Sequence, residues 1–274
     1  MGDEKRLIGV CLSQAHTFLK TDLVSELDRA ARAEGFGIVV FNSSLDYYWA
    51  QKGTNVTGCI YDMIRYDRLC ALVILHENLY DYPLLERMAR RAKEEGIPAF
   101  YLGGARDDCI SIVDDYTEAY KKVLRHVIVD HGVRDTCYIA GLPDEENSQL
   151  RLRCYREVLE EAGIPYNEEN VAYGNYLDPV AAEIVRGLIS RHPVLPPAIM
   201  CANDSMAASV CDELSAHGIR VPEDVIVTGF DGTPTAYLVH PQLTTCNSNP
   251  GSLADLVLRL LGEFRSTAKA TKSC

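Results

Sequence analysis

Motifs that would assign an enzymatic activity are missing from this sequence of 274 residues. The glycine-rich signatures GxGxxG and GxxxxGKS/T of nucleotide-binding loops do not occur, and neither does the GxSxG turn that carries a nucleophilic serine. None of the ten cysteines forms a CxxC pair, which is the usual spacing of zinc and thioredoxin-type sites. His126 and His131 are five residues apart, unlike the i, i+4 histidine pair of zinc-binding helices. We therefore expect this chain to be no enzyme and to use no metal and no cofactor.

The sequence also lacks an excess of basic residues and any long apolar run. Its 27 Lys and Arg residues face 39 Asp and Glu residues, for a net charge of −12. Such a chain repels phosphate backbones, so we expect no direct nucleic acid binding by this chain. No apolar run approaches the ~20 residues that span a membrane, and the charged start MGDEKRLIGV is unlike a signal peptide. We expect a cytoplasmic protein without a membrane partner.

Apolar and amphipathic stretches alternate along nearly the whole chain. Short apolar runs such as LIGVCL (7–12), ALVIL (71–75) and PAIMCA (197–202) indicate buried strands. The stretches between them have the apolar spacing of helices, and several end at a glycine. This alternation is typical of parallel sheets covered by helices. Roughly ten strands are too many for a single sheet, so two sheets in two lobes are predicted.

Polar residues stand where several predicted strands end. In the stretch CANDSMAASV, Asn203 and Asp204 join a predicted strand directly to a predicted helix. Tyr176 and Asp231 also follow apolar strands, and Arg151 opens a helix after another one. Ligands of open parallel sheets bind at the carboxyl ends of the strands. These amide, carboxylate, guanidinium and aromatic groups suit a small polar ligand with hydroxyls or an anion.

Each of these residues also has a simpler structural role open to it. Asp204 could only cap the helix, Asp231 could be a turn residue, and Arg151 could be a solvated helix residue. Two further assignments concern local structure. Asp178, which precedes a proline, is expected to be the N-cap of a helix, and Glu145 is expected to lie in a solvated acidic loop.

The segment PAIMCANDSMAASVCDELSAHGIRVPEDVIVTGFDGTPTAYLVHPQLTT (197–245) resembles the LacI/GalR family of sugar-responsive repressors. The shared pattern contains N-D-x-M-A, then G-I-x-V-P-x-D-V-x-V-x-G-F-D, then P-x-L-T-T, in that order. Weaker similarity in stretches such as IGVCLSQAHTF extends the resemblance over about residues 6–265. It implies the two-lobed periplasmic-binding-protein-like fold, type I. In this α/β fold each lobe is a doubly wound parallel sheet flanked by helices.

The resemblance also implies the domain boundaries. The N-terminal lobe is expected to comprise residues 6–113 plus 247–264, and the C-terminal lobe residues 114–246. A final helix at about 250–264 is expected to return to the N-terminal lobe. Residues 265–274 are then a tail or the start of a connection to an output domain.

A ligand site in the cleft between the lobes follows from the same resemblance. The positions that match the ligand side of the family are Arg151, Asn203, Asp231, Tyr176, Asp115, Ser13 and Phe18. Of the polar pair at the strand–helix junction, Asp204 is expected to cap the helix and Asn203 to face the ligand. Two positions depart from the family pattern, since Cys154 replaces a glycine and Gly232 replaces a second acidic residue.

The function implied by the resemblance is ligand sensing for a LacI-type transcriptional or signalling regulator, with a sugar or sugar derivative as the effector. The family's helix-turn-helix headpiece is not expected in this chain, because only six residues precede Leu7. Parts of the sequence look more like family members fused to a diguanylate cyclase or a histidine kinase. A homodimer is expected as well. The alternative from a different class is a free-standing solute-binding protein of a transport system.

Overall fold

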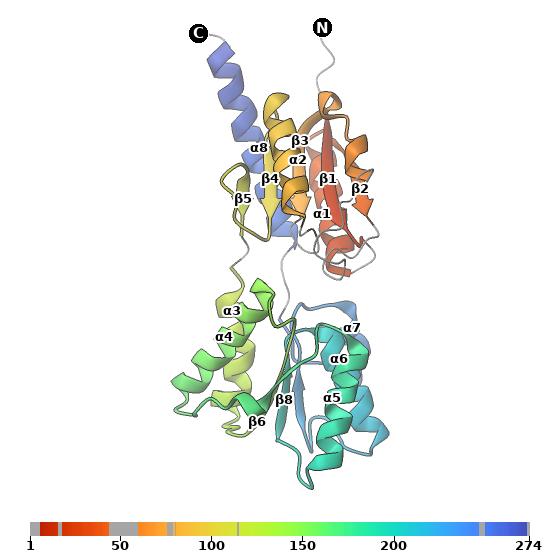
Figure 1. Cartoon of the computed structure of the whole chain (residues 1–274), viewed down its shortest axis with the longest axis vertical. Coiled ribbons are helices and arrows are strands. Elements are labelled where there is room, and N and C mark those ends of the chain that lie inside the picture. The colour runs from red at the N-terminus through yellow and green to blue at the C-terminus, as the bar shows by residue number, and fades with distance from the viewer. Residues whose placement is uncertain are drawn as a thin grey trace. The chain divides into compact units, whose positions relative to one another are not determined.

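The computed structural model describes residues 6–15, 18–43, 60–75, 79, 81–113, 115–246 and 250–272. The chain divides into two compact units: unit 1 combines Met1–Asp114 with Asn249–Cys274, and unit 2 is Asp115–Ser248. Each unit has its own parallel sheet with helices against it (Figure 1). The expected α/β class with two parallel sheets is confirmed.

Unit 1 is built on a five-stranded parallel sheet with the order β2-β1-β3-β4-β5. Its strands are β1 (Leu7–Ser13), β2 (Gly37–Ser43), β3 (Leu69–Leu75), β4 (Ala99–Leu102) and β5 (Ile110–Ile112). Its helices are α1 (Phe18–Ala33), α2 (Tyr82–Glu94) and α8 (Pro250–Lys272), with short 3-10 turns η1 (Ile60–Met63) and η2 (Tyr66–Arg68). All seven residues of β3 are buried, which explains why LCALVIL is an unbroken apolar run.

Alternate residues of β3 pack into two separate cores, one on each face of the sheet. Val73 and Leu75 belong to the core that includes residues of α1 and α8. Leu72 and Ile74 belong to the core that includes residues of α2. Because successive side chains of a strand point to opposite faces, the sheet needs helices on both sides.

Helix α8 is longer than the sequence analysis predicted. The predicted end is near residue 264, but the helix continues to Lys272. The hydroxyls of Ser266 and Thr267 donate to backbone carbonyls one turn earlier, at 2.9 and 3.0 Å. The stretch RSTAKATK also contains no glycine or proline that would end a helix. Residues 265–272 are therefore helical, so the predicted helix end near 264 is wrong, and the role of these residues as a tail or as the start of a connection to an output domain stays a prediction.

Unit 2 is built on a four-stranded parallel sheet with the order β7-β6-β8-β9. Its strands are β6 (Thr136–Ala140), β7 (Val171–Tyr173), β8 (Ala198–Cys201) and β9 (Ile226–Thr228). Its helices are α3 (Thr117–Arg125), α4 (Glu146–Glu161), α5 (Asp178–Arg191), α6 (Asp204–Ala216) and α7 (Pro234–Leu238), with the π-helical turn η3 (His126–Asp130) and the 3-10 turn η4 (Glu168–Asn170). The predicted strand at 243–246 contributes only an isolated bridge between Thr228 and Thr244. Beside this bridge, the amides of Gly229 and Asp231 donate to the carbonyls of Thr244 and Cys246, each at 3.0 Å.

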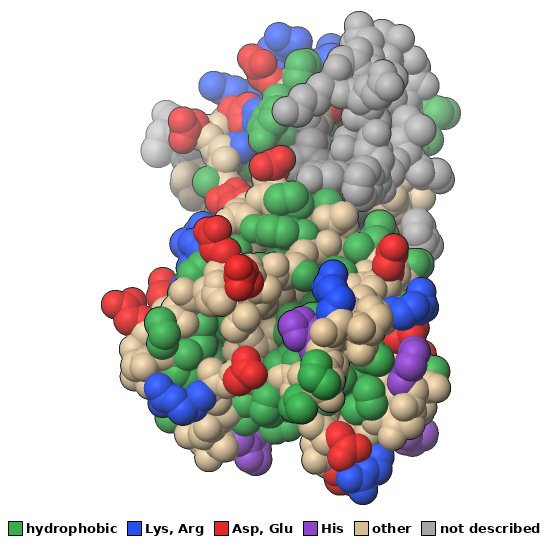
Figure 2. Space-filling view, turned by 60° about the horizontal axis from the view of Figure 1, so that its bottom comes forward, with side chains coloured by type: hydrophobic (Ala, Val, Ile, Leu, Met, Phe, Trp, Pro, Cys, Tyr) green, Lys and Arg blue, Asp and Glu red, His purple; other side chains and the backbone are tan. Residues whose placement is uncertain are grey.

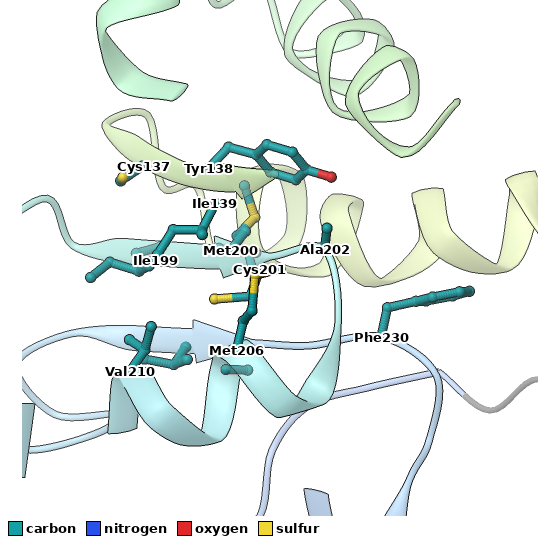
Figure 3. Close-up of a cluster of buried hydrophobic side chains, with 14 of the residues drawn as sticks. Cys137, Tyr138, Ile139, Ile199, Met200, Cys201, Ala202, Met206, Val210 and Phe230 are labelled. Atoms are coloured by element: carbon teal, nitrogen blue, oxygen red, sulfur yellow. The ribbon is translucent and has the colours of Figure 1, made fainter. Parts of the chain in front are cut away.

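Tyrosines fill much of the core of unit 2, and their polar tips are paired. The hydroxyls of Tyr120 and Tyr138 are 2.8 Å apart, and those of Tyr155 and Thr136 are 2.7 Å apart. The rings of Tyr138 and Tyr155 stack with 4.7 Å between their centroids. Figure 3 shows side chains of β6, β8 and α6 meeting in this core. Pairing the hydroxyls lets large aromatic rings be buried without unsatisfied polar atoms.

The surface carries charges of both signs. On the face shown in Figure 2, acidic and basic side chains are scattered among hydrophobic ones and do not gather into one patch. Neither sign of charge therefore dominates the coloured part of that face. Among the residues that the structure describes, no helix is both long and apolar enough to cross a membrane.

Replacing Val210 by alanine should lower the free energy of unfolding by about 2 kcal/mol, because two methyl groups are lost from a closed core. Val210 of α6 is fully buried, whereas Val194 is 81% exposed. Val194→Ala is therefore the matched control and should change the stability by less than about 0.5 kcal/mol. Urea unfolding followed by circular dichroism measures both. Equal effects of the two substitutions would contradict the burial of α6.

Candidate functional site

The carboxyl ends of the strands of unit 2 lie at one edge of its sheet, which we call the strand-end edge. Tyr176 follows β7, Asn203 follows β8 and Asp231 follows β9. The backbone amide of Asp204 donates to the carbonyl of Phe230 at 2.8 Å, which holds the segments after β8 and β9 together. The parallel sheet thus brings residues that are far apart in sequence to one edge.

Arg151 of α4 lies at the centre of the strand-end edge. Its side chain and that of Asp231 are each only 10% exposed. Nη1 of Arg151 donates to the carbonyl of Ala202 at 2.5 Å, and Nη2 donates to Oδ1 of Asp231 at 3.0 Å. Burial by itself lowers the pKa of Arg151. The electrostatic interactions with Asp231 and with nearby tyrosines outweigh this effect and raise the pKa well above its ordinary value. Arg151 is a buried charged cross-link, and the alternative of a solvated helix residue is wrong.

Three aromatic rings surround the guanidinium of Arg151. Its Cζ atom is 4.6 Å from the ring centroid of Phe230, 5.2 Å from that of Tyr116 and 5.8 Å from that of Tyr176. These rings attract the cation and keep water away from the ion pair. The sequence analysis named Tyr176 but missed the other two. Tyr116 directly follows the predicted Asp115, and Phe230 lies inside the G-F-D motif, so proximity to predicted residues was the available signal.

Tyr176 is held in an unusual backbone conformation. Its φ is 60°, in the left-handed region that side-chain-bearing residues rarely occupy. Its ring lies against Gly141, the residue after β6, where a Cβ atom would collide with the ring. Its hydroxyl donates to Oε2 of Glu145 at 3.2 Å. The absence of a side chain at residue 141 therefore leaves the space that the aromatic ring needs.

Glu145 has a structural role that the sequence analysis did not predict. It is buried and is the N-cap of α4, with its carboxylate accepting from the amides of Asn147 and Ser148 at 2.9 and 2.6 Å. A carboxylate satisfies the open amides of a helix start and interacts favourably with the helix dipole. The prediction of a solvated acidic loop is therefore wrong for Glu145.

Asn203, and not Asp204 as predicted, caps α6, while the predicted contact of Asn203 with a ligand stays a prediction. Asn203 is the N-cap of α6: its backbone is extended, and its Oδ1 accepts from the amide of Met206 at 3.0 Å. Asp204 is already helical, and its carboxylate turns to the segments that follow β9. It accepts from the amide and hydroxyl of Thr233 at 2.7 and 3.1 Å and from the hydroxyl of Thr245 at 2.6 Å. The prediction that Asp204 caps the helix is wrong.

The carboxylate of Asp204 occupies a closed site. Burial raises the pKa of Asp204, and the hydrogen bonds from Thr245 and Thr233 oppose this rise. Gly229 lies so close that a Cβ atom there would collide with the carboxylate. Asp204 thus joins α6 to the two segments that follow β9.

Asp231 combines a turn with an ion pair. Its φ of 104° lies in the left-handed region, and Gly232 follows with a φ of 64°. Its amide donates to the carbonyl of Cys246 at 3.0 Å. A residue with a side chain is strained at this φ, so the surrounding structure must hold it there. The ion pair with Arg151 supplies one such restraint.

Asp178 is not the N-cap that the sequence analysis predicted. The N-cap of α5 is Leu177, and Asp178 is the first helical residue. Its carboxylate accepts from the hydroxyl of Ser205, and its carbonyl accepts from the hydroxyl of Ser209 at 2.6 Å. Both donors belong to α6, a helix that is distant in sequence, so they could not be predicted from the residues around Asp178. Asp178 therefore links α5 to α6.

Three further predicted residues have separate surroundings. Asp115 is exposed, and its carboxylate accepts from the amide of Thr117 at 3.1 Å; hydrogen bonding to Thr117 lowers the pKa of Asp115. Ser13 ends β1 in unit 1, is buried, and accepts from Nζ of Lys20 through its carbonyl at 2.9 Å. Phe18 is the first residue of α1, and its side chain lies outside the described residues. A ligand role for these residues stays a prediction.

Two buried polar atoms of α4 have no hydrogen-bond partner among the residues that the structure describes. They are Oγ of Ser148 and Nε of Arg151. The two residues are three positions apart and so lie on one face of the helix. Buried polar groups are normally satisfied by protein, water or a ligand. The strand-end edge therefore has unused capacity for polar contacts.

Asn203→Ala should lower the free energy of unfolding by about 1 kcal/mol through loss of the helix cap, and Asn203→Asp should be nearly neutral. Asp204→Asn should cost about 1–3 kcal/mol, because the amide keeps only one acceptor oxygen, so either Thr233 or Thr245 loses its acceptor. Urea unfolding of the three variants tests the assignment. A neutral Asp204→Asn together with a costly Asn203→Asp would contradict it.

Arg151→Met should lower the free energy of unfolding by about 3–5 kcal/mol, because it leaves the Asp231 carboxylate buried without its partner. Arg153→Met, at an exposed position of the same helix, is the control and should be close to neutral. The double variant Arg151→Met, Asp231→Leu should recover part of the loss. Thermal and urea unfolding measure the cycle, and simple additivity would show that the two side chains are not coupled.

A family model described as the periplasmic binding protein-like domain matches residues 126–272, more than half of the chain. The HTH-type transcriptional regulator CelR of Thermobifida fusca is 32% identical over 182 residues, which cover 65% of this chain and 53% of that regulator. The ribose operon repressor of Escherichia coli (strain K12) is 24% identical over 260 residues, which cover 94% of this chain and 75% of the repressor. The chain thus spans about half of the first of these relatives and three quarters of the second.

Solved structures share the fold. The structure described as the transcriptional regulator CelR-cellobiose complex matches with a TM-score of 0.74 at 24% identity, covering 96% of this chain and 79% of that chain. The lac repressor dimer bound to operator and the anti-inducer ONPF matches with a TM-score of 0.76 at 20% identity, covering 97% of this chain and 88% of that chain. The relatives named here are transcription regulators rather than enzymes, which favours a regulator over a transport protein. The chain belongs to the periplasmic binding protein-like domain family and is a ligand-binding domain of the LacI/GalR type.

Proposed function

We propose that this domain senses a neutral, hydroxyl-rich small molecule, such as a sugar, and that it binds this ligand at the strand-end edge of unit 2. The observation that carries the proposal is the buried pair of Arg151 and Asp231 beside aromatic rings. Oγ of Ser148 and Nε of Arg151 have no hydrogen-bond partner within the described part of the chain, and they support the proposal because a ligand hydroxyl can satisfy such atoms. Ser13, Phe18 and Asp115 are proposed as further ligand-side positions.

The charge balance of the strand-end edge favours a neutral ligand over an anion. The positive charge of Arg151 is already matched by Asp231 at 3.0 Å. An anionic ligand would compete with that carboxylate for the guanidinium and would place two negative charges against one buried positive charge. A hydroxyl can both donate to a carboxylate and accept from an amide or guanidinium, and it leaves the ion pair intact. The faces of Tyr116 and Tyr176 suit the apolar face of a sugar ring.

The proposed output is control of transcription. CelR of Thermobifida fusca is described as an HTH-type regulator, which favours a DNA-binding output over a fused cyclase or kinase. With its net charge of −12, this domain is a poor match for a phosphate backbone, so we assign DNA contact to a separate basic module. We further propose that the domain pairs with a second copy and works in the cytoplasm, as suits a regulator whose signal passes through a subunit interface.

A ligand found by thermal-shift screening of neutral sugars, sugar phosphates and nucleobases should be a neutral sugar. Calorimetry should then show that Arg151→Lys and Asp231→Asn each weaken its binding roughly 5- to 150-fold, because each leaves a desolvated polar group without its partner. Arg153→Lys is the control on the exposed side of α4 and should bind like the parent.

Two results would contradict the proposal. If both variants fold normally and keep the parental affinity, the ligand does not contact the ion pair. If a sugar phosphate or a nucleobase raises the melting temperature and neutral sugars do not, the argument from charge balance is wrong.

A further inference from the structure

A π-helical turn at the end of α3 brings together two histidines that are five residues apart. In η3 the amide of His131 donates to the carbonyl of His126 at 3.1 Å, which is an i→i+5 bond. In a regular α-helix, residue i+5 points about 140° away from residue i, because one turn takes 3.6 residues. In the π turn residue i+5 lies beside residue i. The sequence spacing, which argued against a metal site, therefore does not exclude one here.

The two imidazoles have the separation that a single metal ion requires. Their Nε2 atoms are 3.3 Å apart, and the ring centroids are 4.6 Å apart with an interplanar angle of 71°. Two nitrogens bound to one tetrahedral zinc at about 2.0–2.1 Å from the metal lie about 3.3–3.4 Å from each other. The alternative is a hydrogen bond between a protonated and an unprotonated Nε2, and the two differ in their response to metal.

A carboxylate lies near Nδ1 of His126, the ring nitrogen that does not contact His131. Oδ2 of Asp130 is 3.4 Å from Nδ1 of His126. Histidines that bind metals usually donate their other ring N–H to a carboxylate, which fixes the tautomer and leaves Nε2 as the ligand atom. The neighbouring Arg125 is engaged elsewhere, since it donates to Glu161 at 2.7 Å and to Glu118 at 3.1 Å.

The turn exposes its polar residues and buries two of its three apolar ones, Val127 and Ile128, while Val129 is 51% exposed. Val127 and Ile128 belong to the core of unit 2, whereas His126, Asp130 and His131 are exposed. π turns of this kind occur frequently at functional sites. Burial of the apolar pair anchors the turn, so the imidazoles are presented to solvent on a fixed backbone.

We propose that His126 and His131 form a two-histidine chelate for a divalent transition-metal ion such as Ni²⁺ or Zn²⁺, with Asp130 as a positioning residue. Imidazole nitrogen suits these ions, and water would complete the coordination. Within the ranges that the structure describes, no group of three or more His, Cys, Asp or Glu residues could hold a metal, so the site has two protein ligands. The net charge of −12 favours the approach of a cation.

The test is calorimetric titration of the full chain with Ni²⁺. The thiols are first blocked by alkylation, because Cys109 and Cys246 are partly exposed. The parent should bind one Ni²⁺ about 100-fold or more tightly than His126→Asn or His131→Asn, because a chelate gains from the proximity of its second ligand. Asp130→Asn should weaken binding roughly 10-fold.

His217→Asn is the matched control and should bind like the parent. His217 is also exposed, and its Nδ1 also lies near a carboxylate, that of Glu213 at 3.5 Å. Among the described residues, however, it does not contact another imidazole. The double variant His126→Asn, His131→Asn should be no weaker than either single variant, since losing one ligand already abolishes the chelate.

Two results would overturn the chelate. One is a small loss in each single variant that adds up in the double variant, which would mean two independent surface ligands. The other is equal Ni²⁺ binding by parent and variants. Melting temperatures give a second readout: Ni²⁺ should raise that of the parent and of His217→Asn but not that of His126→Asn. Parental binding by Asp130→Asn would overturn only the positioning role.

Discussion

The ion pair between Arg151 and Asp231 is the contact on which the strand-end edge of unit 2 depends. Taking a guanidinium and a carboxylate out of water is expensive unless each finds a partner with good geometry. Arg151 meets this requirement with Asp231 and with the carbonyl of Ala202, so one side chain joins α4 to the ends of β8 and β9. The rings of Phe230, Tyr116 and Tyr176 then close the surroundings of the charge.

Two other buried carboxylates complete this edge, and each has a different set of donors. Glu145 accepts from the first amides of α4 and from Tyr176, and Asp204 accepts from Thr233 and Thr245. These carboxylates hold the loops in place, whereas the guanidinium of Arg151 still has one nitrogen, Nε, without a hydrogen-bond partner among the residues that the structure describes. In the proposed function, a ligand that contacts the ion pair acts on the same bonds that fix the loops. Differential contact of this kind is what a ligand needs to shift a conformational equilibrium.

Much of the architecture was predictable from periodicity and motif. The buried strands appear as short apolar runs, and β3 is the clearest example because all of its residues are buried. The ordered N-D-x-M-A, G-F-D and P-x-L-T-T motifs indicated the LacI/GalR type, which the comparisons confirm. Of the site residues, Asp231, Tyr176 and Asn203 lie at the strand ends as predicted, because a parallel sheet places all its carboxyl ends at one edge. Arg151 does not open its helix as predicted: α4 begins at Glu146, and the Arg151 side chain reaches this edge from inside the helix. The contact of these residues with a ligand stays a prediction.

The sequence by itself determined the fold class, the family and the edge of the sheet where polar groups gather, because these follow from local periodicity and from motifs read in order. Only the tertiary structure decided what individual polar side chains do. Asn203 and Asp204 are adjacent and both residue types can cap a helix. The carboxylate of Asp204 instead accepts hydrogen bonds from Thr233 and Thr245, which are distant in sequence. His126 and His131 point apart in an α-helix and together in a π turn, a difference of one hydrogen-bond register. A polar group takes the partner that folding brings within reach, and local sequence does not show that partner.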